Sequence, residues 1–288
     1  MATPRDYKNT IVPNWCPGCG DFGIQNAISA VCAKKGWPNE SITLISGIGC
    51  SSRIGGYQYC YGAHTTHGRA LPFAQGIKCA NKDTHLIVCS GDGDSYAIGL
   101  GHGMHAMKRN MDITYLVFDN QVYGLTKGQT SPASSKGFVT KTTPDGNPVT
   151  PLDAPSMAIA AGATFVAQTY AIDMRGMTEI IEKAVDHKGF SYVNIFTPCV
   201  TFNHLNTFQW YNEHLKKISD IRENYDTTSK AEAFHLLAET DGLVTGIIYE
   251  EKDSIPFGDI VPSKDVCLTD HVEKPSDDLF DDLLKEFR

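Results

Sequence analysis

Residues 85–94 read His-Leu-Ile-Val-Cys-Ser-Gly-Asp-Gly-Asp, an apolar run that ends in alternating glycines and aspartates. A short apolar run without polar alternation is typical of a strand that is covered on both faces. Glycines in a strand-to-helix turn let the backbone approach a phosphate, and the N-terminus of the helix that follows favours negative charge. These ten residues therefore predict a buried parallel strand with a binding turn at its carboxyl end.

The same pattern recurs along the chain. Five apolar runs predict strands, at 42–48, 85–90, 113–118, 164–169 and 191–196. The segments between and around them predict helices, at 22–34, 70–81, 96–109, 156–161 and 174–187. Strands that alternate with helices favour an α/β fold with a doubly wound, mainly parallel sheet.

Two segments fall outside this alternation. Residues 129–155 are rich in Ser, Thr, Pro, Gly and Lys and predict a long loop, which in a compact domain is usually functional or mobile. After about residue 202 the chain becomes polar and aromatic, with short helices predicted at 231–238 and 277–287. We expect residues 1–202 to form the cofactor-binding domain and residues 203–288 to form a C-terminal extension that packs on it or on a partner.

The composition excludes several classes of protein. The 288 residues carry a net charge of −8, and their pI is near 5.6. Without a long run of Lys or Arg, these values argue against a nucleic-acid or membrane-surface binder. No apolar stretch has the length of a membrane span and the first residues lack the apolar core of a signal peptide, so we expect a cytoplasmic protein. Nine cysteines in a reducing compartment favour metal, cluster or redox chemistry over disulfides.

Unusual residues follow four of the predicted strands. In an open parallel sheet, ligands bind outside the carboxyl ends of the strands. The segments that come after strands here are 49–53, 91–95, 119–124 and 197–199. Parallel strands bring all four segments to one edge of the sheet, and we expect the functional site at that edge.

Asp92 and Asn120 are candidates for a magnesium site at this edge. A carboxylate in a phosphate-binding turn would repel the phosphate unless a hard cation lay between them. A carboxylate, an amide oxygen, a backbone carbonyl and two diphosphate oxygens would supply the oxygen ligands that Mg²⁺ prefers. The alternative is that Asp92 and Asp94 only cap the helix that begins near Ser95.

This pair resembles the diphosphate-binding motif of thiamine diphosphate enzymes, in which Gly-Asp-Gly is followed by an Asn after the next strand. The resemblance implies that Asp92 and Asn120 hold Mg²⁺ together with the backbone oxygen of Val122. The family motif often has a second Asn, and Gln121 takes that place here.

Cys16 and Cys19 form a CxxC motif with Pro and Gly between the thiols. Such a tight turn lets two thiolates face one metal centre, whereas a thioredoxin-like redox pair should follow a strand, and none is predicted before Cys16. Cys50 and Cys199 lie on loops at the proposed edge, so the four thiolates suffice for a 4Fe–4S cluster or a structural Zn²⁺. The other cysteines are Cys32, Cys79 and Cys89, which we expect to pack in helices and a strand, and Cys60 and Cys267, which have no predicted role.

Five motifs occur in order along the chain: Cys-Pro-Gly-Cys-Gly at 16–20, Gly-Ile-Gly-Cys-Ser-Ser-Arg at 47–53, Thr-His-Gly-Arg-Ala at 66–70, Gly-Asp-Gly-Asp at 91–94 and Asp-Asn-Gln-Val-Tyr-Gly-Leu-Thr-Lys-Gly-Gln at 119–129. Over residues 10–215 the chain resembles the β subunits of 2-oxoacid:ferredoxin oxidoreductases. The His-Gly-Arg segment is more similar to the 2-oxoglutarate branch than to the pyruvate branch. The resemblance implies that the cluster ligands are Cys16, Cys19, Cys50 and Cys199. The residues expected to bind cofactor are Gly49, Ser51, Ser52, His67, Gly91, Asp92, Gly93, Asp94, Asn120, Val122, Tyr123, Gly124 and Leu125.

The resemblance also implies a reaction, the oxidative decarboxylation of a 2-oxoacid with coenzyme A to acyl-CoA, CO₂ and two reduced ferredoxins. Thiamine diphosphate supplies the electron sink for such a decarboxylation. A 4Fe–4S cluster can take up the electrons one at a time, which redox-inert Zn²⁺ cannot do. Thiamine enzymes need a carboxylate from a second α/β domain, and only one such domain fits here. We therefore expect an α subunit as an obligate partner.

Four side chains are candidates for direct roles in this reaction. His67 and Arg69 could donate hydrogen bonds to the diphosphate or to the reacting oxyanion; alternatively, His67 caps a helix and Arg69 pairs with a surface carboxylate. Arg53 and Lys127 could hold the carboxylates of a dicarboxylic substrate. A solvated loop lysine explains Lys127 nearly as well.

Two other functions share part of these features. Half of a non-redox thiamine diphosphate enzyme would use Asp92 and Asn120 but would have no use for four cysteines at the site. A non-catalytic binding module held together by Zn²⁺ would use the thiolates but would leave the Gly-Asp-Gly turn and Asn120 unexplained.

Overall fold

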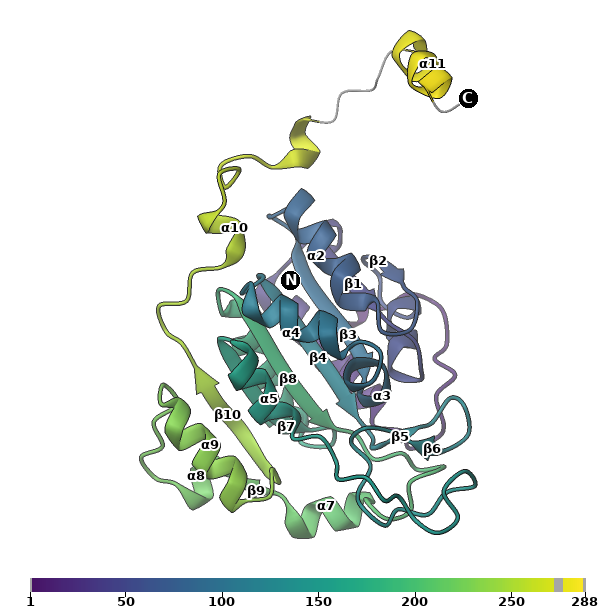
Figure 1. The fold of residues 1–288 in the computed structure, drawn as a ribbon, viewed down its shortest axis with the longest axis vertical. Helices are drawn as coiled ribbons and strands as arrows, with labels where there is room; N and C mark the ends of the chain where they lie inside the picture. Colours follow the sequence, from purple (N-terminus) through teal and green to yellow (C-terminus); the bar gives the residue numbers. More distant parts are fainter. Residues whose placement is uncertain (1, 272–276, 287–288) are drawn as a thin grey trace.

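The computed structural model describes residues 2–271 and 277–286, which build an eight-stranded sheet with helices on both faces (Figure 1). The strand order in the sheet is β2-β1-β3-β4-β8-β7-β10-β9. The strands are β1 Ile42–Ser46, β2 Tyr61–His64, β3 His85–Gly91, β4 Ile113–Asp119, β7 Phe165–Tyr170, β8 Phe190–Phe196, β9 Lys216–Lys217 and β10 Val244–Glu250.

The five predicted strands are confirmed as β1, β3, β4, β7 and β8, and they pair in parallel with their neighbours. The predicted α/β class with a mainly parallel sheet is therefore correct. Two further strands of more than two residues, β2 and β10, were not predicted. β2 is a short, mostly exposed edge strand without an apolar run. β10 belongs to the polar C-terminal part of the chain and pairs antiparallel with β7.

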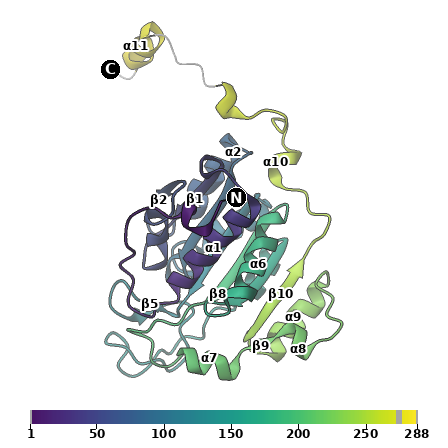
Figure 2. The same ribbon diagram turned by 180° about the vertical axis from the view of Figure 1, so that it is seen from behind.

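Helices cover the sheet on both sides. α1 and α6 lie on one face (Figure 2), and α2, α4 and α5 lie on the other (Figure 1). Each face buries an apolar cluster against the strands. The helices are α1 Asp21–Lys35, α2 Ala70–Ala80, α3 Asp92–Tyr96, α4 Leu100–Lys108, α5 Ala154–Ala161, α6 Met174–Asp186, α7 Phe208–His214, α8 Ile218–Ile221, α9 Lys230–Glu239, α10 Phe257–Ile260 and α11 Asp277–Glu286.

The prediction of one helix over 96–109 was wrong. The helix begins at Asp92, directly after β3, and is interrupted between α3 and α4 at residues 97–99. The backbone of Gly68 packs against this break: a Cβ on Gly68 would lie 2.4 Å from the side chain of Ile98 and 2.7 Å from the nitrogen of Gly99. Gly68 also has a positive φ of 69°. The break is thus a tertiary packing feature, which local periodicity does not reveal.

The predicted loop 129–155 is shorter at both ends than expected. Its first two residues form β6 Gln129–Thr130, which pairs antiparallel with β5 Val122–Tyr123. Its last two residues belong to α5. The helix predicted at 231–238 is present as α9, and the helix predicted at 277–287 is present as α11, except that residue 287 lies outside the described residues. In the described part of the chain, no helix combines the length and the apolar character needed to cross a bilayer.

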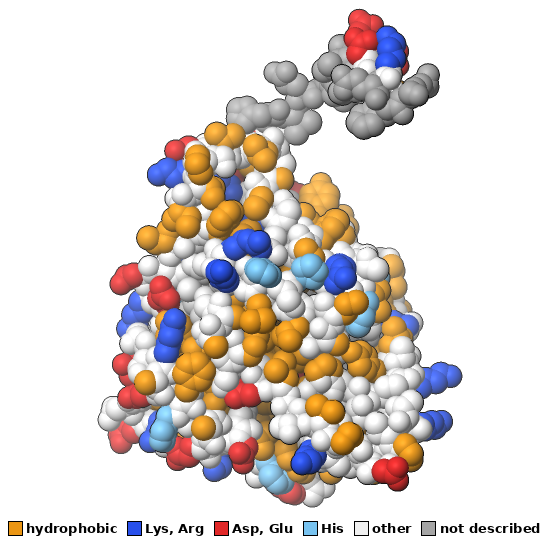
Figure 3. Space-filling view, in the orientation of Figure 1, with side chains coloured by type: hydrophobic (Ala, Val, Ile, Leu, Met, Phe, Trp, Pro, Cys, Tyr) orange, Lys and Arg blue, Asp and Glu red, His pale blue; other side chains and the backbone are white. Residues whose placement is uncertain are grey.

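Acidic side chains are unevenly distributed over the surface. Figure 3 shows hydrophobic, basic and histidine side chains in the middle of one face, over α2 and α4, and acidic side chains mostly toward its left and lower margins. The sequence agrees, since neither 61–82 nor 95–111 contains an Asp or Glu. Phe73, Ile98 and Met104 are large hydrophobic side chains exposed on this face.

Candidate functional site

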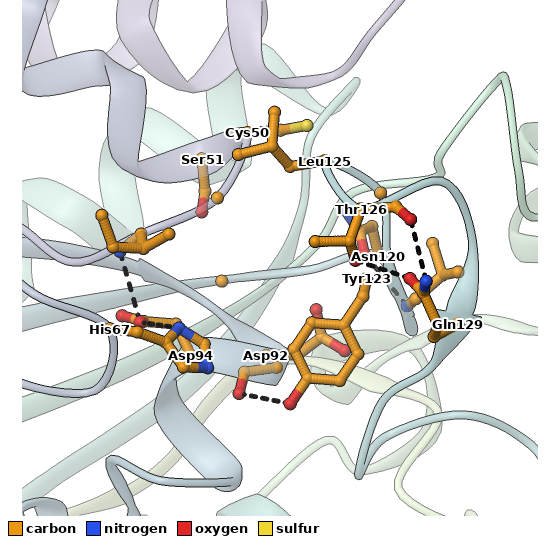
Figure 4. A pocket seen from close by; sticks show the side chains of 16 residues that line it. Cys50, Ser51, His67, Asp92, Asp94, Asn120, Tyr123, Leu125, Thr126 and Gln129 are labelled. Atoms are coloured by element: carbon orange, nitrogen blue, oxygen red, sulfur yellow. Dashed lines mark hydrogen bonds and ion pairs between the residues drawn. The ribbon is translucent and has the colours of Figure 1, made fainter.

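A cavity of about 460 Å³ lies at the carboxyl ends of β1, β3 and β4, at the edge where the site was expected. All residues predicted to bind cofactor line it except Ser52. Four further residues line the cavity without having been predicted to bind cofactor: Ile48, Cys50, Thr126 and Gln129. Figure 4 shows the labelled side chains around this cavity, and they come from the segments that follow β1, β2, β3 and β4.

The two glycines of the Gly-Asp-Gly turn offer backbone to the cavity. A Cβ on Gly93 would lie 2.3 Å from the ring of Tyr123, whose hydroxyl donates a 2.9 Å hydrogen bond to the Gly93 carbonyl. A Cβ on Gly91 would lie 3.0 Å from the hydroxyl of Ser51. Only glycine fits at residue 93, as expected from the sequence for a turn whose backbone must approach a ligand closely.

Asp92 is a buried carboxylate, 1% exposed, at the start of α3. The Ser131 hydroxyl donates to its Oδ2 atom. Burial, together with the negative charge of Asp119, raises the pKa of Asp92 well above its ordinary value. Burial also raises the pKa of Asp119 to about 6, although Asn194 donates a 3.1 Å hydrogen bond to it. Two carboxyl groups so poorly solvated favour a nearby cation.

The alternative that Asp92 and Asp94 are only helix caps does not hold. Gly91 is the N-cap of α3 and no side chain caps that helix. The Asp94 carboxylate instead joins three segments of the cavity wall. Its Oδ1 atom accepts hydrogen bonds from the backbone nitrogens of Gly68 at 2.7 Å and Ile48 at 3.2 Å, and its Oδ2 atom accepts one from the Ser90 hydroxyl at 2.8 Å.

Two of the four predicted cluster cysteines, Cys50 and Cys199, lie at this cavity. A Cβ on Gly124 would be 3.6 Å from the sulfur of Cys50 and 3.7 Å from that of Cys199. The CxxC turn is closed by a 3.0 Å hydrogen bond from the Cys19 nitrogen to the Cys16 carbonyl. Gly18, inside the turn, has a positive φ of 82° and lies next to the side chain of Val200. The loops that carry Cys50 and Cys199 therefore meet beside Gly124, and the CxxC turn lies next to the segment that follows Cys199.

The pKa values of these thiols reflect their shared environment. Burial, with the charges of Asp21 and Cys199, raises the pKa of Cys50 to about 11. Burial raises the pKa of Cys19 further, and Asp21, Cys199 and Cys50 add to the effect. A raised pKa favours the neutral thiol at Cys19 and Cys50, and binding to a metal would release their protons. Asp21, the first residue of α1, is itself buried, which raises its pKa to about 7.

Among the described residues, no group of three or more His, Cys, Asp or Glu side chains is placed to hold a single metal ion. A 4Fe–4S cluster and a structural Zn²⁺ on the four cysteines both stay predictions. All nine cysteines are free thiols.

Besides Cys16, Cys19 and Cys199, four predicted site residues lie outside the cavity lining. Arg53 donates a 2.6 Å hydrogen bond to Asn14, and Arg69 donates to the carbonyl oxygens of Gly68 and Ile98, each at 3.3 Å. Lys127 is exposed on the β5–β6 loop with a positive φ of 76°. Ser52 is fully buried, and its hydroxyl has no hydrogen-bond partner. The roles predicted for these four side chains remain predictions.

Sequence reasoning missed two side chains that support the site. Ser131, in the predicted loop, donates to Asp92. The indole of Trp15 donates to the carbonyl oxygen of Cys50. Trp15 directly precedes the CxxC motif, which is a local signal, whereas nothing around Ser131 in the sequence points to Asp92, 39 residues away.

Comparison with known proteins agrees with this geometry. Residues 47–195 match the family described as thiamine pyrophosphate enzyme, C-terminal TPP binding domain, and residues 199–265 match the family described as the C-terminal part of the pyruvate ferredoxin oxidoreductase β subunit. The 2-oxoacid:ferredoxin oxidoreductase subunit β of Saccharolobus solfataricus is 44% identical over 209 residues, which are 72% of this chain and 68% of that protein. The chain belongs to the 2-oxoacid:ferredoxin oxidoreductase β-subunit family.

Further members of the family are similarly close. The 2-oxoglutarate synthase subunit KorB of Archaeoglobus fulgidus is 42% identical over 77% of this chain and 84% of that protein. A solved structure of 2-oxoglutarate:ferredoxin oxidoreductase from Magnetococcus marinus, with 2-oxoglutarate, coenzyme A and succinyl-CoA bound, superposes with a TM-score of 0.85 at 40% identity. The match covers 88% of this chain and 87% of the other. The resemblance predicted from the motifs is confirmed: the chain is an oxidoreductase β subunit, which functions with an α subunit.

Proposed function

We propose that this β subunit, assembled with its α subunit, catalyses the coenzyme A-dependent oxidative decarboxylation of 2-oxoglutarate to succinyl-CoA and passes the electrons through a 4Fe–4S cluster to ferredoxin. The observation that carries the proposal is that Cys50 and Cys199 flank Gly124, on the wall of the same cavity that Asp92 lines. The choice of 2-oxoglutarate over pyruvate draws on the relatives named for 2-oxoglutarate and on the ligands of the Magnetococcus structure.

The cavity fits a diphosphate and a divalent cation. Asp92, the side-chain oxygen of Asn120 and the carbonyl of Val122 would hold Mg²⁺, because a buried carboxylate without a cation is costly. The glycine backbone at 91 and 93 would bind the diphosphate oxygens, next to the amino end of α3. Bound there, thiamine diphosphate would supply the electron sink for loss of CO₂.

Cys16, Cys19, Cys50 and Cys199 would hold the cluster, close enough to the cavity to receive electrons from it. Burial of Cys19 and Cys50 and the neighbouring Asp21 carboxyl would tune its potential, because charge and solvent exposure set the potentials of such clusters. Free thiols and an oxygen-sensitive cluster suit the cytoplasm, where we place the enzyme.

His67 lines the cavity and is our candidate for a group that acts on the reacting atoms. Arg53 and Lys127 would bind substrate carboxylates only if their side chains turned toward the cavity when substrate and the α subunit are present. For Arg69 we propose a positioning role on the His67 loop in place of the direct role predicted from sequence, since its guanidinium donates to the Gly68 and Ile98 carbonyls.

The α subunit would complete the site by supplying the carboxylate that thiamine enzymes need. The acid-free face over α2 and α4 is a suitable contact surface, because Phe73, Ile98 and Met104 expose large hydrophobic side chains there. It adjoins the cavity through the packing of Gly68 on Ile98. We propose that residues 203–288 also help to hold the α subunit.

Anaerobic co-purification of both subunits tests the function. We expect a broad absorbance band at about 400 nm that bleaches with dithionite, as iron–sulfur thiolate centres show. The complex should reduce ferredoxin with 2-oxoglutarate and coenzyme A, and more slowly with pyruvate. The β chain alone should not. A colourless complex with stoichiometric zinc, or a β chain active by itself, would refute the proposal.

A further inference from the structure

His67 has its ring against a carboxylate that cannot move. Its Nδ1 atom lies 2.7 Å from Oδ1 of Asp94, which is 2% exposed and is fixed by Gly68, Ile48 and Ser90. A Cβ on Gly47 would lie 1.8 Å from Oδ2, so the backbone also closes over the carboxylate. The position of Asp94 is therefore set from three segments of the chain.

The two nitrogens of His67 have different surroundings. Nδ1 is fully buried and faces Asp94, at a distance short enough for a charge-assisted hydrogen bond but without the angles of an ideal one. Such bonds commonly tighten when ligand binds. The His67 side chain is 37% exposed and lines the cavity, with the ring of Tyr123 at 6.2 Å. The charged and titratable groups nearest the ring are thus Asp94, Tyr123 and, two residues along the loop, Arg69.

We propose that Asp94 is a positioning residue for His67: it holds the proton of the imidazole on Nδ1 and thereby makes Nε2 the nitrogen that faces the reacting end of the cavity. This inference rests on the proposed function for the nature of the reaction. A neutral imidazole has one N–H, so a ring that gives Nδ1–H to a carboxylate keeps a free lone pair on Nε2.

The consequence is that neutral His67 accepts a proton rather than donates one, which revises the role predicted from sequence. Nε2 can take the proton of an O–H or S–H group in the cavity, leaving the electron pair on that oxygen or sulfur. The imidazolium that forms is stabilised by the Asp94 carboxylate, and it can return the same proton later. No electron is transferred to or from the ring in this step.

Asp94→Asn is the decisive variant, because it removes the charge and keeps most contacts. The amide oxygen can accept from Gly68, Ile48 and the Nδ1–H of His67 in place of Oδ1, and the amide N–H can donate to the Ser90 hydroxyl, so this variant tests the charge that stabilises the imidazolium. Asp94→Ala removes the acceptor for Nδ1–H as well. Asp112→Asn is the control, since this carboxylate pairs with Lys78 at 2.9 Å and does not line the cavity. His67→Ala is a further variant, at a partly exposed position where truncation leaves no cavity in the core.

In the anaerobic αβ complex we expect Asp94→Asn to lower kcat about 10- to 100-fold, the usual cost of losing a group that orients a functional histidine. The KM for 2-oxoglutarate and the Kd for thiamine diphosphate should change little, and Asp112→Asn should behave as wild type. Adding Asp94→Asn to His67→Ala should lower kcat no further, which a double-mutant cycle measures. An equal loss in both backgrounds would overturn the proposal.

A readout independent of turnover is the labelling of His67 by diethyl pyrocarbonate, followed by mass spectrometry of the complex without substrate. We expect labelling in the wild type and in Asp112→Asn, and labelling several-fold slower in Asp94→Ala, which has no acceptor for the Nδ1–H of His67. Unchanged labelling in Asp94→Ala would overturn the proposal. If the wild-type complex did not convert 2-oxoglutarate, the proposed function would fail, and the labelling would still decide whether Asp94 orients the ring.

Discussion

The indole nitrogen of Trp15 donates a 2.7 Å hydrogen bond to the carbonyl oxygen of Cys50, 35 residues away. The Trp15 ring is buried edge-on against Phe22 and Tyr57, with ring centroids at 5.2 Å and 4.9 Å. The bond ties the segment that carries Cys16 and Cys19 to the loop that carries Cys50. One side chain thus fixes the relative position of two halves of the proposed cluster site.

Trp15→Phe should therefore loosen the cluster without unfolding the chain. Phenylalanine keeps the aromatic packing but loses the N–H, at a cost of about 1 kcal/mol. We expect faster loss of the absorbance at about 400 nm in air, because a loosened thiolate shell exposes the cluster. Trp37→Phe, at the opposite edge of the sheet where Trp37 stacks on His85, should decay like the wild type. Equal decay rates in the two variants would rule out this role for Trp15.

Asp92→Asn should abolish the cation site and retain the cluster. Without the carboxylate, affinity for thiamine diphosphate with Mg²⁺ should fall at least about tenfold, or 1.4 kcal/mol, in calorimetry of the complex. The ligand-free variant should melt no lower than the wild type, because an uncompensated buried charge has been removed. Asp112→Asn is the control, since Asp112 pairs with Lys78 at the other edge of the sheet. Normal cofactor affinity in Asp92→Asn would contradict the assignment.

Two glycine substitutions should distinguish a glycine that cofactor binding requires from one that can be replaced without loss of stability. In Gly93→Ala the new Cβ would lie 2.3 Å from the Tyr123 ring, so the ring must move and cofactor affinity should fall. In Gly76→Ala, on exposed α2, the Cβ meets nothing within 4 Å, and the helix should gain up to about 1 kcal/mol. Thermal melting and calorimetry measure both effects. Undiminished cofactor binding by Gly93→Ala would show that the turn tolerates a side chain.

Acid should destabilise the chain partly through His187. Burial lowers the pKa of this ring below 6.5, and Nε2 lies 2.8 Å from the Thr164 hydroxyl. The unfolded chain then binds the proton more readily than the folded chain, so this contribution to stability is complete above pH 6.5 and is lost as pH falls toward the folded pKa. His187→Gln should flatten this part of the profile of unfolding free energy against pH. His235→Gln, at an exposed position, should leave the profile unchanged.

The agreement between sequence and structure is best where local signals suffice. The five parallel strands could be predicted because a strand that is buried on both faces is a continuous apolar run in the sequence. Asp92 and Asn120 could be paired because parallel strands end at one edge of the sheet. β2 was missed because an exposed edge strand has no continuous apolar run. The break between α3 and α4 was missed because it depends on packing against Gly68, nearly thirty residues earlier in the chain.

The sequence by itself determined the α/β class, the candidate cysteine ligands and the Gly-Asp-Gly binding turn. Each of these features is encoded in a few neighbouring residues. Only the tertiary structure decided that Ser131 supports Asp92, that Arg69 holds backbone rather than facing the cavity, and that Asp94 turns its carboxylate to His67. These contacts join segments far apart along the chain. Their partners are selected by packing and by the need to satisfy buried polar groups, which local sequence does not record.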